Sequence, residues 1–199
     1  GIPLFYALLT IAAGLLQGIL MALFVIPAIM LLREGVVEGQ VSRDKVMAML
    51  TIFVFNVLFW MFFEQAGSSF NFLADKIVDR DIGMQGLFQA LAGTNAFPVA
   101  WFQSVNSVAI IALAPVLAWL WVKMGKNNPI IPRKFGLGLI FNGLAFLLLM
   151  VALSSMVDDA GKIPFWTLFM VYVIQSVGEL CLSPIGLSMT TKLAPTKLV

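Results

Sequence analysis

Five long apolar runs dominate this chain of 199 residues and constrain its fold more than any other feature. A helix needs about 20 mainly apolar residues to cross a bilayer, so each run predicts a transmembrane helix. Charged residues make up only 11% of the chain, against about 25% in soluble domains. The runs are too long for barrel strands, so we expect an all-α, polytopic membrane protein. The expected spans cover residues 2–32, 46–75, 98–122, 135–156 and 164–192.

The basic residues are distributed unevenly between the two sides of this predicted membrane protein. Nine follow the first, third and fifth spans: Arg33, Arg43, Lys45, Lys123, Lys126, Arg133, Lys134, Lys192 and Lys197. The other side holds three: Lys76, Arg80 and Lys162. Because basic residues gather on the cytoplasmic side, we expect a multi-pass protein of the cell's inner (plasma) membrane. Residue 1 is expected to be external and residue 199 cytoplasmic.

The chain lacks residues that several kinds of chemistry need. It has no histidine, so it cannot supply a histidine-ligated zinc, haem or di-iron site, and no nucleotide-binding loop motif occurs in it. Its single cysteine, Cys181, lies in an apolar run and is expected to be a packing residue. The net charge of +2 gives no sign of a nucleic-acid partner. We expect neither an enzyme nor a protein with a cofactor or metal.

Two glutamates interrupt the apolar spans. Glu64 is the one charged residue within residues 46–74, and Glu179 is the one within residues 163–191. A charged carboxylate costs on the order of 2.5–3.5 kcal/mol at the centre of a membrane helix, and such residues usually line a polar path. Neither glutamate has a cationic residue within the five spans to pair with. Both are therefore candidate functional residues.

Polar side chains recur at helical spacing on three spans. On the second and fifth spans they follow one another at steps of three or four residues, which places them along one helix face. On the third span, Gln103 and Asn106 are three residues apart and are neighbours on the helix surface. Such stripes face protein or water rather than lipid. The two longer sets are Asn56, Trp60, Glu64, Ser68 and Asn71, and Gln175, Glu179, Ser183, Gly186 and Thr190.

Several of these residues have a simpler interpretation, which is that they join helices to one another. Interhelical hydrogen bonds of this kind contribute about 0.6 kcal/mol each. Taken alone, the amide and hydroxyl residues of the second and fifth spans fit this role, as does Asn142 on the fourth. Trp60, one turn before Glu64, fits a site wall better than an interfacial anchor. The packing interpretation also covers three glycines: Gly136, Gly138 and Gly143.

Four segments resemble, in order, helices seven to ten of the proton-dependent oligopeptide transporters, a branch of the major facilitator superfamily. The first is the stretch WMFFEQAGSS at residues 60–69, and the fourth is GELCLSPIGLSM at residues 178–189. These two are the most specific. The second segment comprises residues 101–106 and 113–119, and the third comprises residues 135–138 and 143–146.

The resemblance covers about residues 46–199. Bacterial members of the family insert a helical hairpin between two six-helix halves, and the first span is placed to be its second arm. The predicted domains are an inter-half linker helix with a cytoplasmic loop, residues 1–45, and a partial C-terminal half, residues 46–199. Signatures of the first, fourth and fifth helices are absent, as are helices eleven and twelve. We therefore expect a fragment that works with the remaining helices of the same transporter.

The resemblance implies a symporter that imports di- and tripeptides with protons by alternating access. In the family, the residue matching Glu179 takes the peptide amino terminus, helped by the one matching Asn106. Those matching Trp60 and Glu64 line the same cavity, and the latter is linked to proton coupling. The implied partners are di- and tripeptides, protons and the lipid bilayer. The predicted substrate-binding residues are Trp60, Glu64, Gln103, Asn106, Glu179 and Ser183.

Two other functions are compatible with the sequence. A related secondary transporter would keep the fold and carry another small solute, such as nitrate or an organic cation. A membrane-binding subunit or receptor-like relative would bind a ligand without moving it. The acid-and-arginine motif of the family's first helix distinguishes these alternatives, because its loss argues against proton coupling.

Overall fold

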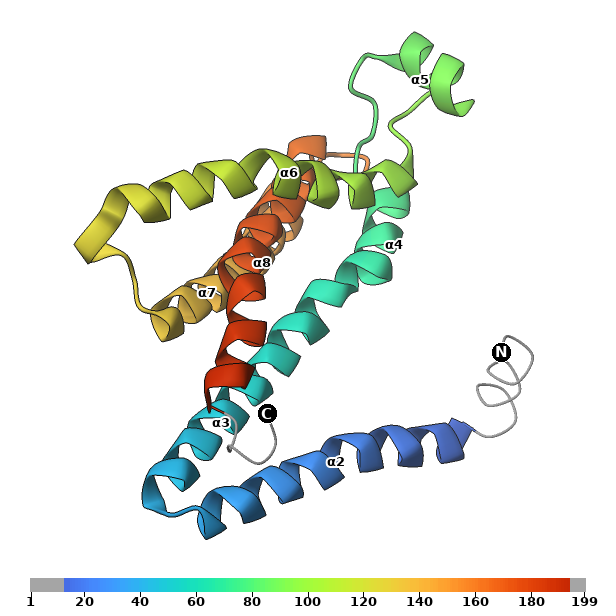
Figure 1. Ribbon diagram of the computed structural model, residues 1–199. Coiled ribbons are helices and arrows are strands. Elements are labelled where there is room, and N and C mark those ends of the chain that lie inside the picture. The colour runs from blue at the N-terminus through green and yellow to red at the C-terminus, as the bar shows by residue number, and fades with distance from the viewer. Residues whose placement is uncertain (1–12, 194–199) are drawn as a thin grey trace. The chain divides into compact units, whose positions relative to one another are not determined.

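The computed structural model describes residues 13–193, with side chains for residues 14–182 (Figure 1). It is helical, and five of its helical segments are long and apolar enough to cross a membrane, which confirms the predicted fold class and number of spans. These segments are Gly14–Val37, Gln40–Lys76, Val99–Asn127, Ile131–Ser155 and Phe165–Leu182. The chain forms two compact units, residues 56–187 and the remainder.

The unit outside residues 56–187 contains helix α2 (Ala13–Val37) and the first part of α3 (Gln40–Phe63). The turn between them uses Gly39, whose φ of 109° is a conformation that favours glycine. Gly35 and the buried Val46 bring the two helices together, because a Cβ at Gly35 would lie 2.8 Å from Val46 Cγ2. The side chains of α2 are otherwise mainly exposed and apolar, as expected of a helix in lipid.

The second span is not one regular helix. Helix α3 gives way to a 3-10 segment at Glu64–Gly67, Ser68 has non-helical angles (φ −126°, ψ −80°), and α4 follows at Ser69–Lys76. A 3-10 helix has 3.0 residues per turn instead of 3.6. The single polar face predicted for this span therefore ends at Glu64. Beyond it Ser68 is exposed, whereas Asn71 is half-buried and donates to Gly67 O at 3.2 Å.

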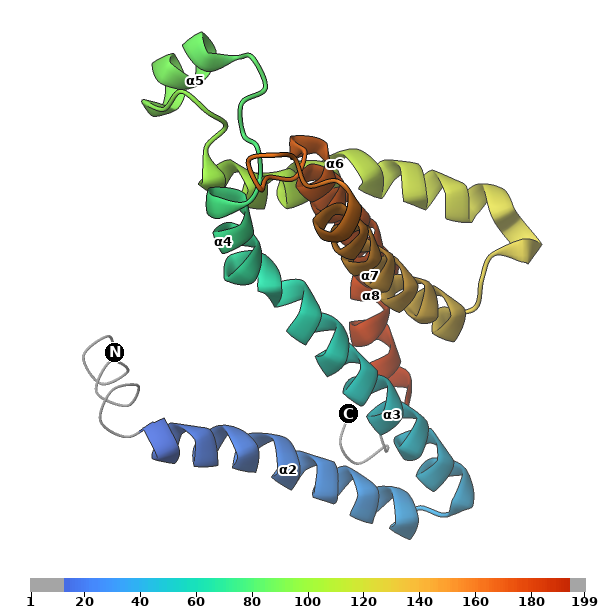
Figure 2. The same cartoon turned by 180° about the vertical axis from the view of Figure 1, so that it is seen from behind.

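Three long helices complete the unit of residues 56–187, and Figure 2 shows them from behind. Helix α6 starts after Pro98 and ends at Gly125, whose φ of 48° is left-handed. Pro132 lies in the first turn of α7, where its missing N–H costs nothing. These helices are α6 (Val99–Met124), α7 (Ile131–Ser155) and α8 (Phe165–Leu193), and the short helix α5 (Gln85–Ala92) precedes them.

Helices α7 and α8 lie side by side in both views (Figures 1 and 2). Gly138 of α7 faces Gly178 of α8 so closely that a Cβ at Gly138 would lie 2.8 Å from the Gly178 carbonyl oxygen. The packing role predicted for Gly138 is confirmed. For Gly136 and Gly143 it stays a prediction, because a Cβ at either position would meet no described atom within 4 Å.

The core of this unit is aromatic where α4, α6 and α8 meet. Phe70, Phe102 and Tyr172 are buried, and the Tyr172 ring lies 5.8 Å from Phe70 and 6.2 Å from Phe102. Cys181 is also buried and has a free thiol, in keeping with its predicted packing role. This cluster fixes α8 against the end of the second span.

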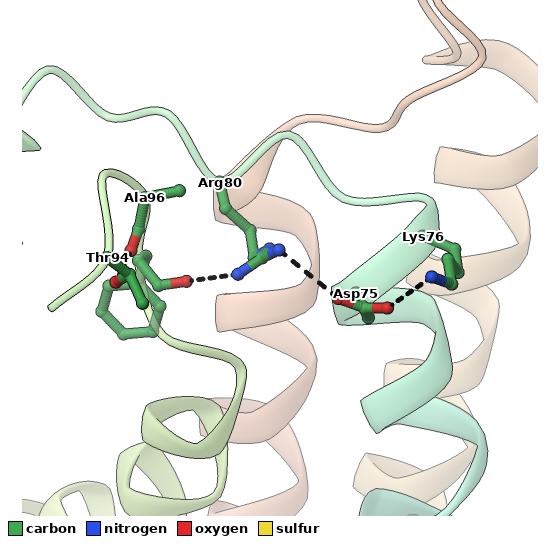
Figure 3. Close-up of polar contacts among 6 residues, drawn as sticks. Asp75, Lys76, Arg80, Thr94 and Ala96 are labelled. Atoms are coloured by element: carbon green, nitrogen blue, oxygen red, sulfur yellow. Dashed lines mark hydrogen bonds and ion pairs between the residues drawn. The ribbon is translucent and has the colours of Figure 1, made fainter. Parts of the chain in front are cut away.

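The loops at one end of the unit are tied together by backbone and side-chain bonds. Ile163 N donates to Ile77 O at 2.8 Å, and Asp79 N donates to Ile163 O at 2.9 Å. Arg80 donates to Phe97 O at 3.0 Å. It also approaches Asp75 Oδ1 at 3.5 Å, as Figure 3 shows. The ends of the second, third and fifth spans are thereby held together.

Candidate functional site

A small cavity of about 180 Å³ lies among the 3-10 segment, α6 and α8. Three of the predicted substrate residues, Glu64, Gln103 and Asn106, line it. Its other lining residues are Phe63, Ala66, Gly67, Tyr172 and Gln175. The three helical stripes singled out in the sequence thus meet at one place within residues 56–187.

Asn106 links the third span to the fifth. Its side-chain Nδ2 donates to Glu179 Oε2 at 3.2 Å and to Ser176 Oγ at 2.9 Å. Because an ionised carboxylate only accepts hydrogen bonds, the amide must turn its NH₂ group toward Glu179. The side-chain oxygen of Asn106, Oδ1, then points away from that contact and stays available as an acceptor.

A second chain of amides runs through the interior of the unit. Gln175 Nε2 donates to Asn142 Oδ1 at 3.0 Å, and Asn142 Nδ2 donates to the carbonyl oxygen of Phe59 at 3.3 Å. Gln175 is 1% exposed and Asn142 is 4% exposed. These bonds join α3, α7 and α8, so the helix-joining role predicted for both residues is confirmed.

The Gln175 carbonyl oxygen is buried and has no hydrogen-bond partner among the described atoms. Leaving such an acceptor unpaired costs about 1–3 kcal/mol. The side-chain oxygen of Asn71 is also buried without a hydrogen-bond partner among the described atoms. Gln175 differs from Asn71 in that it also lines the cavity.

The electrostatic character of the site comes from its carboxylates. Glu64 is exposed at the first position of the 3-10 segment, and Glu179 is half-buried. Within residues 14–182, neither makes an ion pair. The cavity therefore presents a carboxylate and neutral amides, which suits the positive or hydrogen-bond-donating end of a ligand. No group of three histidine, cysteine or carboxylate side chains in the described part of the chain is arranged to hold a metal.

Three predicted site residues are placed differently from the rest. Glu179 is not among the residues that line the cavity, and its hydrogen bond from Asn106 connects it to them. Trp60 is half-buried in an aromatic cluster, with its ring 5.6 Å from Phe59 and 5.2 Å from Phe63, and it is not among the residues that line the cavity. It supports the wall through Phe63. Ser183 belongs to α8, but its side chain lies outside the described residues.

Two residues that shape the site are not among those predicted from the sequence. Tyr172 lines the cavity, and its hydroxyl donates to Ala66 O at 3.3 Å, which ties α8 to the 3-10 segment. Ser176 accepts from Asn106 and donates to Tyr172 O at 2.8 Å. A signal was present, because Tyr172, Ser176 and Glu179 recur at steps of four and three residues.

A larger cavity of about 600 Å³ lies between α6 and α8. Its lining is apolar apart from Ser104, with Phe97, Trp101 and Phe169 among its walls. It contains neither glutamate and none of the linked amides. In a membrane protein such an apolar surface can face lipid or another helix, so size does not make it the functional site.

Apolar helices long enough to cross a membrane, arranged around a polar cavity that holds a carboxylate, are typical of membrane transport proteins. Residues 22–199 match the model of a single transporter family, PTR2 (POT family). The chain belongs to the POT family, whose fold is that of the major facilitator superfamily.

Individual relatives agree with this assignment. The chain is 36% identical over 156 residues to the uncharacterized transporter YclF of Bacillus subtilis, covering 78% of this chain. It is 35% identical over 162 residues to the peptide transporter YePEPT of Yersinia enterocolitica, covering 79% of this chain. The matched part is 29% of the length of each relative.

Solved structures of the family resemble the chain along nearly all of its length. A mutant of the peptide transporter POT in complex with sulfate superposes with a TM-score of 0.77 at 35% identity, covering 98% of this chain and 38% of that one. A POT family transporter in complex with a thioalcohol-conjugated peptide gives a TM-score of 0.75 at 30% identity, covering 99% of this chain and 39% of that one.

Proposed function

We propose that this chain is part of a proton-coupled symporter that imports di- and tripeptides by alternating access. The observation that carries the proposal is the hydrogen bond between Asn106 and Glu179, which joins two predicted ligand-binding residues beside an acceptor-rich cavity. The relatives support the cargo, since YePEPT is a peptide transporter and one solved neighbour holds a conjugated peptide.

The peptide ammonium group is assigned to Glu179 and Asn106. An ammonium carries three donors and no acceptor, and the carboxylate of Glu179 is matched to it in charge. The hydrogen bond from Asn106 fixes the position of Glu179 and leaves the side-chain oxygen of Asn106 as a second acceptor. Poor screening inside a membrane protein strengthens such an ion pair relative to water.

The proton is assigned to Glu64. Its carboxylate lines the cavity, and it begins the 3-10 segment that interrupts the second span. Mid-helix 3-10 stretches often mark hinges. Adding a proton to Glu64 removes its charge at that joint, which shifts the balance between two conformers if they solvate the charge differently.

The remaining predicted site residues keep supporting roles in the proposal. Gln103 lines the cavity beside Asn106, Trp60 supports the wall, and Ser183 follows Glu179 by one turn. The proposed domains are the linker region of residues 1–45 and the partial C-terminal half of residues 46–199. The proposed location is the inner (plasma) membrane, with residue 1 external and residue 199 cytoplasmic.

The experiment uses the full-length transporter reconstituted in proteoliposomes. Under an imposed inward proton gradient, we expect labelled dialanine to accumulate above its external concentration. Collapsing the gradient with a protonophore should abolish accumulation while exchange of peptide across the membrane continues. If dialanine neither binds nor enters, the proposed function is wrong.

A second candidate function keeps the fold and changes the cargo to a small organic cation. The site's own charges favour it over nitrate, because the described residues that line the cavity include the carboxylate of Glu64 and no cationic side chain. Competition of labelled dialanine uptake by unlabelled dialanine and by a simple alkylammonium distinguishes the two. A peptide carrier is inhibited by dialanine far more than by an alkylammonium, whereas an organic-cation carrier shows the reverse order.

A further inference from the structure

The amide of Gln175 has an orientation that its neighbours dictate. The Phe59 carbonyl oxygen can only accept, so Asn142 must offer it the NH₂ group and turn its own carbonyl oxygen toward Gln175. Gln175 must then donate to that oxygen. This leaves the Gln175 carbonyl oxygen as the free end of the chain, and it is buried without a donor in the described structure.

The free oxygen belongs to a side chain that lines the same cavity as Glu64 and Asn106. The cavity of about 180 Å³ equals roughly six water volumes, at about 30 Å³ each. It is large enough for part of a small polar ligand. The Gln175 oxygen is covered in the described conformation, so a ligand donor in the cavity reaches it once the side chains between them shift.

The position of Gln175 relative to Glu179 narrows the choice of donor. The two residues are four apart on α8, which separates them by about 6 Å along one helix face. In a peptide, the ammonium nitrogen and the first peptide-bond nitrogen are separated by two carbon atoms. With hydrogen bonds of about 2.9 Å at each nitrogen, an ammonium held by Glu179 brings the peptide-bond N–H within reach of Gln175.

We propose that the Gln175 carbonyl oxygen accepts a hydrogen bond from the first peptide-bond N–H of the bound ligand. The inference rests on the proposed function, since it needs the ammonium at Glu179. It makes Gln175 a specificity-determining residue that distinguishes peptides from esters and from peptides with a substituted nitrogen. Sites built to hydrogen-bond a ligand N–H discriminate against analogues that lack it, because the buried group is then left unpaired.

The test compares dialanine with its ester analogue, alanyl-lactate, in which oxygen replaces the peptide N–H. Binding to the full-length transporter is measured by competition against a labelled peptide. We expect the wild type to bind dialanine about tenfold more tightly than the ester, the effect of one good hydrogen bond. Gln175→Met should reduce that ratio to about one, mainly by weakening dialanine binding.

Two further variants separate this role from a structural one. Gln89→Met makes the same chemical change on α5, at an exposed residue outside the cavity, and should keep the tenfold ratio. If Gln175→Met does not fold, the double replacement Asn142→Leu/Gln175→Met removes both amide partners together and should also give a ratio near one.

The outcomes are distinguishable. A wild type that binds dialanine and the ester equally overturns the role of Gln175 and leaves the proposed function standing; a bound water is then the partner of its oxygen. A variant that keeps the tenfold ratio overturns the role as well. A wild type that binds neither compound overturns the proposed function itself.

Discussion

Replacing Gly138 by alanine tests the close contact between α7 and α8. The new Cβ would lie 2.8 Å from the Gly178 carbonyl oxygen and 3.1 Å from Leu182 Cβ. Neither atom can rotate away, because one belongs to the backbone and the other is attached directly to it. The helices must move apart by several tenths of an ångström. Overpacking of this kind costs about 1–3 kcal/mol.

Gly143→Ala is the matched control on the same helix, because a Cβ there meets no described atom within 4 Å. Both variants gain the helix propensity of alanine over glycine, about 1 kcal/mol. The difference between them therefore isolates the packing effect. In thermal unfolding of the full-length transporter in detergent, followed by tryptophan fluorescence, we expect Gly138→Ala to melt lower and Gly143→Ala to melt at or above the wild type. Equal shifts in both variants would refute the close contact.

Three further predictions concern the site and the topology. Glu179→Gln should weaken binding of free-amine peptides by at least tenfold and of N-acetylated peptides much less; an equal loss for both classes would exclude the amine-anchor role. Glu64→Gln should abolish uptake driven by a proton gradient while counterflow exchange of peptide remains, and normal uphill accumulation by this variant would place the proton elsewhere. In a Cys181→Ala background, an impermeant thiol reagent applied outside intact cells should label a cysteine introduced at Gly86 and not one at Asn127; labelling of the latter would reverse the proposed orientation.

The spans could be predicted from the sequence because membrane crossing depends mainly on length and hydropathy, which are local properties. The helix-joining roles of Asn142 and Gln175 followed from chemistry, since amides inside a bilayer need partners. Which atom each amide would contact did not follow. It depends on the rotation of α3, α7 and α8 about their axes, and the sequence of one helix does not determine that rotation.

The break in the second span shows most clearly what a local sequence pattern does not predict. Periodicity alone predicts one continuous face from Asn56 to Asn71, yet the chain forms a 3-10 segment from Glu64 to Gly67. The Tyr172 hydroxyl, more than 100 residues away in the chain, donates to Ala66 O within that segment. A tertiary contact of this kind lies outside any local pattern. The same holds for Gly138, which differs from Gly143 only in facing a partner.

The amide chain from Gln175 through Asn142 to Phe59 also has an evolutionary consequence. Replacing either amide alone leaves the other buried without a partner, which is more costly than replacing both by apolar residues of similar shape. The two positions should therefore change as a pair during divergence of the family. Homologues with an aliphatic residue in place of Asn142 should carry an aliphatic residue in place of Gln175, while the Phe59 position, which contributes only its backbone oxygen, is free to vary with the packing around it.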